Sequence, residues 1–523
     1  MRGIVGLLLQ LILLTQKYVD SGKILVLSVQ FGSHLNEFAA VSEALLKMGH
    51  TVHVVMDENR PNPSQFKGMN VEFIHYRSPD KELASQDVFD AQMADAFLTK
   101  RSGMWTVLTT IIQPRFTYDC KMALNDAKMV ERLKHEQYEL VLADIALPCY
   151  HLLAHKLGVP TVTLSTTQLS WYVKTHPLVS PFAPCLVNKD TNTFFKRLKT
   201  FFEVLIYERV ITNLFADTSS FVDYTPKKPY ASLGDLVMQS KLFLYNRNGV
   251  IDCPTPGMPN LIKVGGLTAR PAQPLQADYQ TFVEEAKHGV IIVSFGSSVP
   301  FLPKDMFLKF IEVFNQIEQR IIWKTTKTYD EQIPKNVKIV KWLPQNDLMA
   351  HPSIKLFITH CGNNGQLEAL FHGVPMLGFP IYGDQPYNTE RMVYKGYGLG
   401  MDIHSFTTKE LTNNIKEIIT NTKYTEAIKK ASKIQRTLPD PRDTSAFWID
   451  HVITHGADHL TTTLSSLTFV QYFMLDVLLF LVVAPLILIM AVVCTFCCVK
   501  RMMDGNTKTK DQPRIRRKKK KTE

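Results

Sequence analysis

Several signatures of common protein classes are missing from this 523-residue sequence. The first strand–turn–helix pattern lacks the glycine-rich fingerprint of dinucleotide-binding folds. The body of the chain lacks the CxxC pairs that hold structural zinc. It has no Asn-x-Ser/Thr acceptor for N-glycosylation, because Pro63 bars Asn62-Pro63-Ser64. Five of the eight cysteines lie in this body, namely Cys120, Cys149, Cys185, Cys253 and Cys361. Their odd number and irregular spacing argue against a disulfide framework.

Most of the net positive charge lies at the C-terminus. Residues 500–523 carry 11 Lys and Arg against 3 Asp and Glu, which is a net +8 of the +11 for the whole chain. The basic balance is therefore a property of the tail, and it gives no reason to expect nucleic-acid binding. A length of 523 residues exceeds one ordinary core and predicts two domains with appendages.

Apolar runs at the two ends predict a targeting segment and an anchor. Residues 1–22 combine an arginine, the apolar run Ile4–Leu14 and small residues, as a secretory signal peptide does. Val477–Val499 has 23 residues without a charge, and a helix of that length spans about 34 Å, enough to cross a bilayer. The flanking Lys500-Arg501 predicts a cytosolic tail and a lumenal body, which is a single-pass type I arrangement.

The chain ends in Lys520-Lys521-Thr522-Glu523. This ending looks like the dilysine retrieval signal of endoplasmic-reticulum membrane proteins, which a receptor reads as an address. A solvated basic tail that binds anionic lipid is the alternative. The sequence thus predicts a protein of the endoplasmic-reticulum membrane.

The most informative stretch runs from Trp342 to Gln385. Its two short apolar runs, Leu356–Thr359 and Met376–Phe379, predict buried parallel strands. Each run ends in polar residues, where open α/β sheets bind ligands. The first is followed by a turn, Thr-His-Cys-Gly-Asn-Asn-Gly, and then by a helical pattern. A helix N-terminus of this kind suits a phosphate group.

The polar groups of this stretch suit successive parts of a sugar nucleotide. Trp342 offers a flat face for a base, Gln345 an amide for its edge, and Glu368 a carboxylate for ribose hydroxyls. Taken alone, a residue such as Trp342 is more often a core aromatic, and a histidine such as His360 is more often a structural loop histidine. The residues expected near the diphosphate are Gly296, Ser297, His360, Gly362, Asn364 and Gly365, and those near the hexose are Asp384 and Gln385.

This run resembles the donor-binding signature of the membrane-bound animal UDP-glycosyltransferases. The matching elements are W-x-P-Q, T-H-x-G-x-N-G, Glu368, an H-G-V-P turn and a closing D-Q. The resemblance covers about residues 23 to 500. It implies an α/β fold of the GT-B type, in which two doubly wound Rossmann-like domains face a cleft. The first would bind the acceptor and the second the nucleotide, with a signal peptide and a C-terminal transmembrane helix added.

The expected divisions of the chain follow from these segments. Inside the first domain, Lys23–Ser28 and Thr51–Met56 predict strands around a helix from Asn36 to Met48, whereas residues 60–135 show no clean alternation. In order, we expect a signal peptide (1–22), an acceptor-binding domain (23–268), a linker (269–285), a UDP-sugar-binding domain (286–456), a membrane-proximal segment (457–476), a transmembrane helix (477–499) and a basic tail (500–523).

A histidine and an aspartate follow two predicted strands of the first domain. His34 comes after Lys23–Ser28, and Asp144 comes after Tyr138–Ala143. A histidine at a strand end is a candidate general base, although a lone loop histidine is more often structural. In the resembled family, G-S-H and the D-x-x-x-P-C stretch carry a catalytic His–Asp pair. The resemblance therefore implies that His34 deprotonates the acceptor and that Asp144 orients its ring.

One position bears on the donor sugar. Vertebrate relatives that transfer glucuronate carry an arginine in a P-R-P triplet, whereas this chain has Pro254-Thr255-Pro256. Thr255 has no charge to pair with a sugar carboxylate. The sequence therefore favours UDP-glucose over UDP-glucuronate, unless Arg270 or Lys263 reaches the same place.

Together these features predict an inverting UDP-glycosyltransferase that transfers a hexose to a hydroxyl of small lipophilic acceptors and forms β-glycosides. The UDP-sugar is a co-substrate, and neither a cofactor nor a metal is expected, in keeping with the lack of a D-x-D pair in the donor run. The expected partners are the donor, the acceptor and the membrane, without nucleic acid, and a homo- or hetero-oligomer is possible. The alternative is a catalytically inactive sugar-nucleotide- or lipid-binding membrane protein that acts as a partner subunit. Intact His34 and Asp144 argue against it.

Overall fold

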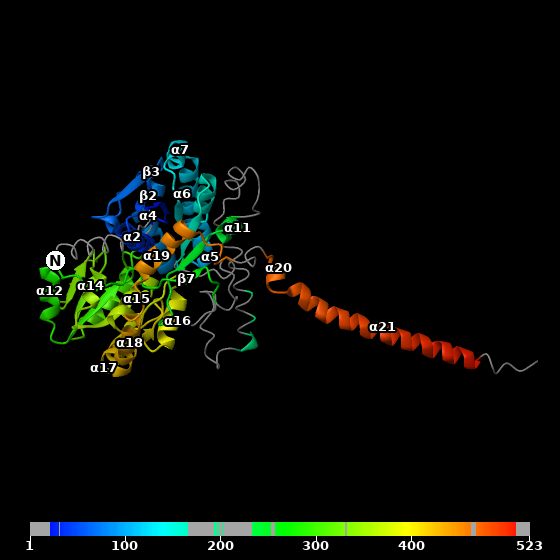
Figure 1. Cartoon of the computed structure of the whole chain (residues 1–523). Helices are drawn as coiled ribbons and strands as arrows, with labels where there is room; N and C mark the ends of the chain where they lie inside the picture. Colours follow the sequence, from blue (N-terminus) through cyan, green and yellow to red (C-terminus); the bar gives the residue numbers. More distant parts are fainter. Residues whose placement is uncertain are drawn as a thin grey trace, which may run out of the picture. The chain divides into compact units, whose positions relative to one another are not determined.

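A computed structural model describes residues 21–30, 32–165, 193–195, 198, 202, 233–252, 257–329, 332–461 and 467–508. The described chain forms two compact units that divide after Thr461 (Figure 1). Several predictions fall outside the described residues, namely the signal peptide up to residue 20, Thr255, the dilysine-type signal at 520–523 and the cysteines Cys185 and Cys253.

The first part of the larger unit is built on a parallel sheet in the order β3-β2-β1-β4-β5-β6-β7. Its strands are short apolar runs, as expected when helices cover both faces of a sheet. They are β1 (Lys23–Leu27), β2 (Thr51–Asp57), β3 (Val71–Tyr76), β4 (Leu140–Asp144), β5 (Thr161–Ser165), β6 (Leu242–Tyr245) and β7 (Leu261–Lys263).

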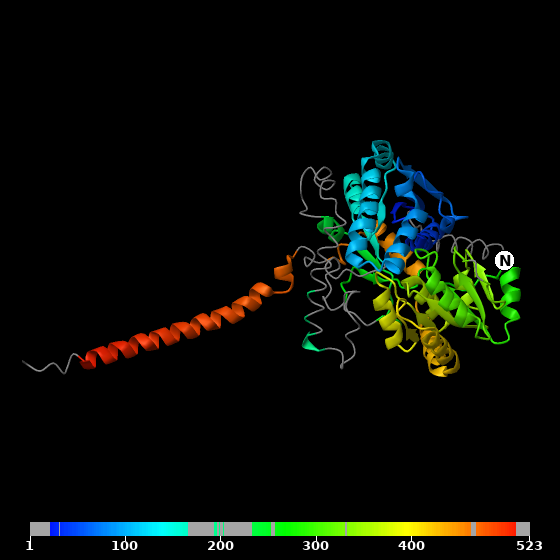
Figure 2. The same ribbon diagram turned by 180° about the vertical axis from the view of Figure 1, so that it is seen from behind.

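Alternate strand residues of this sheet face two different helix layers. Leu25 and Leu27 pack with α6 (Gln113–Asn125), α7 (Ala127–His135), α8 (Cys149–Leu157) and α11 (Leu233–Met238). Ile24 and Val26 pack with α2 (Gly32–Lys47) and with α19 (Pro441–His455), which returns from the far end of the unit. Figure 2 shows α19 in orange among the blue elements.

The region from 60 to 135 contains regular structure that the sequence did not predict. After β3 come α3 (Lys81–Ala84), α4 (Gln86–Ala94), the π-helical turn η2 (Asp95–Thr99), α5 (Met104–Val107) and a second π-helical turn, η3 (Leu108–Ile112). Strand β3 was not predicted because it lies at the sheet edge, where the exposed residues Glu72 and His75 interrupt the apolar run. Leu98 of η2 packs into the core of the second sheet.

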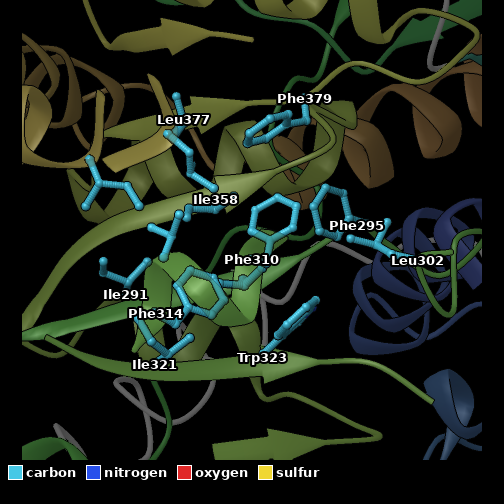
Figure 3. Close-up of a cluster of buried hydrophobic side chains, with 14 of the residues drawn as sticks. Ile291, Phe295, Leu302, Phe310, Phe314, Ile321, Trp323, Ile358, Leu377 and Phe379 are labelled. Carbon is cyan, nitrogen blue, oxygen red and sulfur yellow. The ribbon is translucent and has the colours of Figure 1, made fainter. Parts of the chain in front are cut away.

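The second sheet is also parallel, in the order β10-β9-β8-β11-β12-β13. One face is covered by α13 (Lys304–Phe314) and α17 (Thr408–Thr420). Figure 3 shows this core, with Phe310 lying between Phe379 and Trp323. The strands are β8 (Val290–Ser294), β9 (Arg320–Lys324), β10 (Val337–Val340), β11 (Ile354–Thr359), β12 (Met376–Gly378) and β13 (Gly398–Gly400).

The opposite face of the second sheet carries a different set of helices. Val290 and Ile292 of β8 pack there among apolar residues of the covering helices. Those helices are α12 (Ala277–Glu284), α14 (Gln345–Met349), α15 (Asn363–His372), α16 (Gln385–Tyr394) and α18 (Thr422–Gln435). Two parallel sheets with helices on both faces confirm the predicted α/β class.

One cysteine pair corrects the sequence interpretation. Cys120 on α6 and Cys149 at the start of α8 form a disulfide, although the odd cysteine count argued against such bridges. Cys361 is buried and reduced. The odd count therefore reflects at least one cysteine that stays free, and it does not exclude pairing among the others.

The smaller unit contains one long apolar helix, α21 (Leu475–Lys508). Within it, Leu475–Met503 is long and apolar enough to cross a membrane, with a mean hydropathy of 3.2. The predicted Val477–Val499 lies inside this span. Pro485 stands inside the helix, as membrane helices tolerate. The helix fits a single-pass membrane protein.

Candidate active site

The His34–Asp144 pair is assembled by two neighbouring strands and one helix. Helix α2 begins at Gly32, earlier than the predicted Asn36, so His34 lies in the first turn of the helix. Asp144 is the last residue of β4, which pairs with β1. His34 Nδ1 lies 2.7 Å from Asp144 Oδ2. The structure therefore brings together the two residues that the sequence proposed as a pair.

The surroundings of Asp144 fix the orientation of the imidazole. The backbone N–H of Val29 donates to Asp144 Oδ2 at 3.1 Å, and that of Ala146 donates to Oδ1 at 3.0 Å. A carboxylate that receives these donors acts as an acceptor toward the ring, so His34 Nδ1 carries the proton. Nε2 of His34 is then the nitrogen that can accept a proton from a substrate.

The charges around His34 make it a stronger base than an ordinary histidine. Burial lowers its pKa, but the Asp144 carboxylate outweighs burial and, with Glu37 and Asp384, raises the pKa of His34 to about 9. Glu37 lies on α2 with only 1% of its surface exposed. Sequence reasoning missed Glu37, although its position in the next turn after His34 was a usable signal.

Two glycines close around the ring of His360, which follows β11. A Cβ atom at Gly296 or at Gly362 would lie 2.6 Å from His360 Nε2, closer than real contacts allow. Burial lowers the pKa of His360 to about 4, against the opposing effect of Asp384. The ring is therefore neutral at pH 7 and offers one N–H donor near the N-terminus of α15, whose N-cap is Gly362.

Asn364, in the first turn of α15, bridges the two sheet regions. Its Nδ2 donates to Glu37 Oε1 at 2.9 Å and to the carbonyl of Ser33 at 3.3 Å. Its Oδ1 accepts from Asn246 Nδ2 at 2.9 Å. This predicted diphosphate residue thus contacts the helix that carries His34. Gly365 follows, and a Cβ there would meet Gln345 Nε2 at 3.4 Å.

The predicted base and ribose residues lie close together. Gln345 is the first residue of α14, and its Nε2 donates to Glu368 Oε2 at 2.7 Å. Burial raises the pKa of Glu368 to about 7, against the effect of this hydrogen bond. Trp342 is 67% exposed, which rules out the alternative that it is a core aromatic. Its open ring is suited to stacking on a base.

Lys324 is a charged residue of this region that the sequence prediction missed. It ends β9, and its Nζ donates to the carbonyl of Gly296 at 3.0 Å and lies 5.7 Å from the centre of the Trp342 ring. Burial lowers its pKa. The usable signal was its place at a strand end, on the same sheet edge as His360. Ser297 is exposed in the turn after β8.

The two predicted hexose residues differ in their surroundings. Asp384 is the residue before α16, and its Oδ2 accepts from Asn388 Nδ2 at 2.8 Å. Gln385 Oε1 accepts from the backbone N–H groups of Ile381 and Tyr382 at 2.8 and 3.0 Å, so it holds the loop before the helix. Asp384 affects the pKa of both His34 and His360.

A cation that the sequence did not suggest lies close to Asp384. Arg247 NH2 lies 3.9 Å from Asp384 Oδ2, and Arg247 NH1 lies 2.9 Å from Asp252 Oδ1. Arg270 instead pairs with Asp347 at 2.8 Å. Within the described ranges, no group of three or more His, Cys, Asp or Glu side chains is arranged to hold a metal ion.

Comparison with known proteins identifies the class. The family model described as "UDP-glucoronosyl and UDP-glucosyl transferase" matches residues 22–509. The 2-hydroxyacylsphingosine 1-beta-galactosyltransferase of Rattus norvegicus is 30% identical over 469 residues, which cover 87% of this chain and 84% of that protein. UDP-glucuronosyltransferase 1A8 of Homo sapiens is 30% identical over 508 residues, 93% of each chain.

A solved structure gives the same answer for the fold. The glycotransferase of kitacinnamycin matches with a TM-score of 0.59 at 20% identity, over 83% of this chain and 100% of that chain. The fold is thus that of a GT-B glycosyltransferase, as the sequence predicted. The chain belongs to the UDP-glucuronosyl and UDP-glucosyl transferase family.

Proposed function

We propose that this protein is an inverting UDP-hexosyltransferase that glycosylates hydroxyl groups of small lipophilic acceptors. The observation that carries the proposal is the contact of 2.7 Å between His34 Nδ1 and Asp144 Oδ2. His34 lies on α2, and Asn364 at the start of α15 donates to the carbonyl of Ser33 on the same helix. A base on one side and a phosphate-type helix terminus on the other are the two halves of a glycosyl transfer site.

The reaction needs one proton transfer and one displacement. Nε2 of His34 takes the proton of the acceptor hydroxyl while the oxygen attacks the anomeric carbon of an α-linked UDP-hexose. The bond from this carbon to the phosphate oxygen breaks, and UDP leaves with the electron pair. Attack from the side opposite to UDP inverts the anomeric centre and gives a β-glycoside.

The leaving diphosphate requires positive charge or hydrogen-bond donors. The N-terminus of α15, neutral His360 and Lys324 are proposed to supply them, so that no metal ion is required. Trp342 would stack on the uracil, Gln345 and Glu368 would bind the base edge and ribose, and Asp384 would bind hexose hydroxyls. Gln385 would act through the loop that its carbonyl holds.

The donor is proposed to be UDP-glucose. Thr255 lacks the charge that a glucuronate carboxylate needs. Arg247, which lies close to Asp384, already pairs with Asp252. UDP-galactose and UDP-glucuronate also belong in the test, since the names of the two relatives specify a galactosyltransferase and a glucuronosyltransferase. The body is proposed to lie in the lumen of the endoplasmic reticulum, because Lys500-Arg501 would stay in the cytosol.

A donor screen on microsomes that contain the full chain tests this proposal. UDP-glucose, UDP-galactose and UDP-glucuronate are each supplied with a panel of phenols, with and without EDTA, and the products are separated by mass. The expected result is an EDTA-resistant hexoside from UDP-glucose. UDP release at background level with all three donors would contradict the proposal and favour an inactive partner subunit.

A further inference from the structure

Glu37 is a buried carboxylate at the contact between the two sheet regions. It lies on α2, in the turn after His34, and only 1% of its surface is exposed. Burial of a carboxylate is costly unless hydrogen bonds compensate. One compensating donor is Asn364 Nδ2, which lies 2.9 Å from Glu37 Oε1 and comes from α15. An acidic residue of the base-bearing helix therefore contacts the helix proposed to bind the diphosphate.

The contact is one link of a longer hydrogen-bonded chain. Asn364 also accepts from Asn246 Nδ2 at 2.9 Å, and the carbonyl of Asn246 accepts from Asn363 Nδ2 at 2.8 Å. The backbone N–H of Gly266 donates to Asn246 Oδ1 at 3.0 Å. Glu37 thus fixes one end of a chain that joins α2, the start of α15 and the segments that follow β6 and β7.

We propose that Glu37 is a positioning residue, which holds the His34 helix against the N-terminus of α15 and presents a second negative charge to the imidazole. The proposal rests on the proposed role of His34 as the base. In this arrangement, the hydrogen bond orients the Asn364 side chain on the donor side, and the charge acts on the acceptor side.

The charges around His34 define the expected pH effect. Asp144 faces it from β4, Asp384 from the start of α16, and Glu37 from α2 itself. Burial raises the pKa of Glu37 itself to about 7. Asp144 also raises this pKa, whereas His34, Asn364 and Asn246 lower it. Glu37 is therefore ionised where His34 titrates, near pH 9. Removal of its charge should lower the pKa of His34.

The test compares substitutions that separate charge from hydrogen bonding. Glu37→Gln keeps an oxygen that can accept from Asn364 but removes the charge. We expect the acid limb of its kcat/KM profile to move to lower pH by about one unit, with the donor KM nearly unchanged. Glu37→Ala also loses the hydrogen bond, and its donor KM should rise roughly tenfold or more. The matched control is Glu43→Gln on the same helix, where Glu43 pairs with exposed Lys47, and its profile should match the wild type.

Glu37→Asp and His34→Ala complete the test. Glu37→Asp retains the charge with a shorter side chain, so it should keep the wild-type acid limb of the kcat/KM profile but have a lower kcat. Wild-type kcat and donor KM in this variant would overturn the positioning role, even if Glu37→Gln failed to fold. If His34→Ala is inactive while Glu37→Gln keeps the wild-type profile, only the inference about Glu37 is overturned. If His34→Ala retains transfer, the proposed base is wrong and the inference falls with it.

Discussion

Substitution of Gly362 by alanine tests how the ring of His360 is held. Gly362 is the N-cap of α15 with φ −60° and ψ 144°, which any residue can adopt, so the change adds no backbone strain. The new Cβ would lie 2.6 Å from His360 Nε2. Since the loop backbone is fixed by the sheet and α15, the imidazole has to move. Loss of one aligned donor at a developing anion typically lowers kcat by roughly 10²–10³-fold, or about 2.7–4 kcal/mol.

The assay is steady-state transfer to a phenol, with a matched control and a double-mutant cycle. Gly103→Ala is the control, because Gly103 is also an N-cap with extended backbone, at φ −63°, and a Cβ there meets nothing within 4 Å. In a His360→Ala background the clash is gone, so Gly362→Ala should add little further loss. Gly362→Ala with near-wild-type kcat, or with a full additional loss in that background, would refute the reasoning.

Three other predictions concern the base, the disulfide and the tail. Because the pKa of His34 is raised from 6.5 to about 9, kcat/KM should increase from pH 7 to pH 9. The stability that the His34–Asp144 pair adds is complete below pH 6.5 and is lost as pH rises through 9. A flat profile of kcat/KM between pH 7 and pH 9 would contradict the prediction for the base. Replacement of Cys120 and Cys149 by serine opens a loop with a sequence separation of 29. It should lower the free energy of unfolding by roughly 3–4 kcal/mol, seen as a lower denaturation midpoint. An unchanged midpoint would show that the disulfide adds no stability. Replacement of Lys520 and Lys521 by serine should release the protein from the endoplasmic reticulum but leave it in membranes, as fractionation and imaging would show; a soluble product would mean that α21 is not an anchor.

The donor-binding half of the fold could be predicted because its signals are local. Each of β8, β11 and β12 is a short apolar run, and β11 leads directly through His360 and Gly362 into the helix α15. The same rule for strand ends applied to Lys324. It was missed because a lysine after Ile-Ile-Trp reads as a strand boundary, and its contact with Gly296 appears only when β8 and β9 pair.

Other features depend on contacts between distant parts of the chain. Glu37 and Asn364 are 327 residues apart in sequence, so no local pattern reveals their hydrogen bond. The disulfide was missed for a similar reason, since cysteine counting says nothing about which residues the fold brings together. Arg247 was missed because it follows β6, a strand of four residues that sequence periodicity did not detect.

The anomeric configuration of the product tests the central claim most directly. The full chain in microsomes is incubated with α-linked UDP-glucose and a phenol that gave product in the screen, and the glycoside is analysed by proton NMR, with His34→Ala as the blank. The account predicts a β-glucoside that is absent, or lowered by roughly 10²–10⁴-fold, in the His34→Ala sample. An α-glucoside, or an equal yield of β-glucoside from the variant, would contradict it.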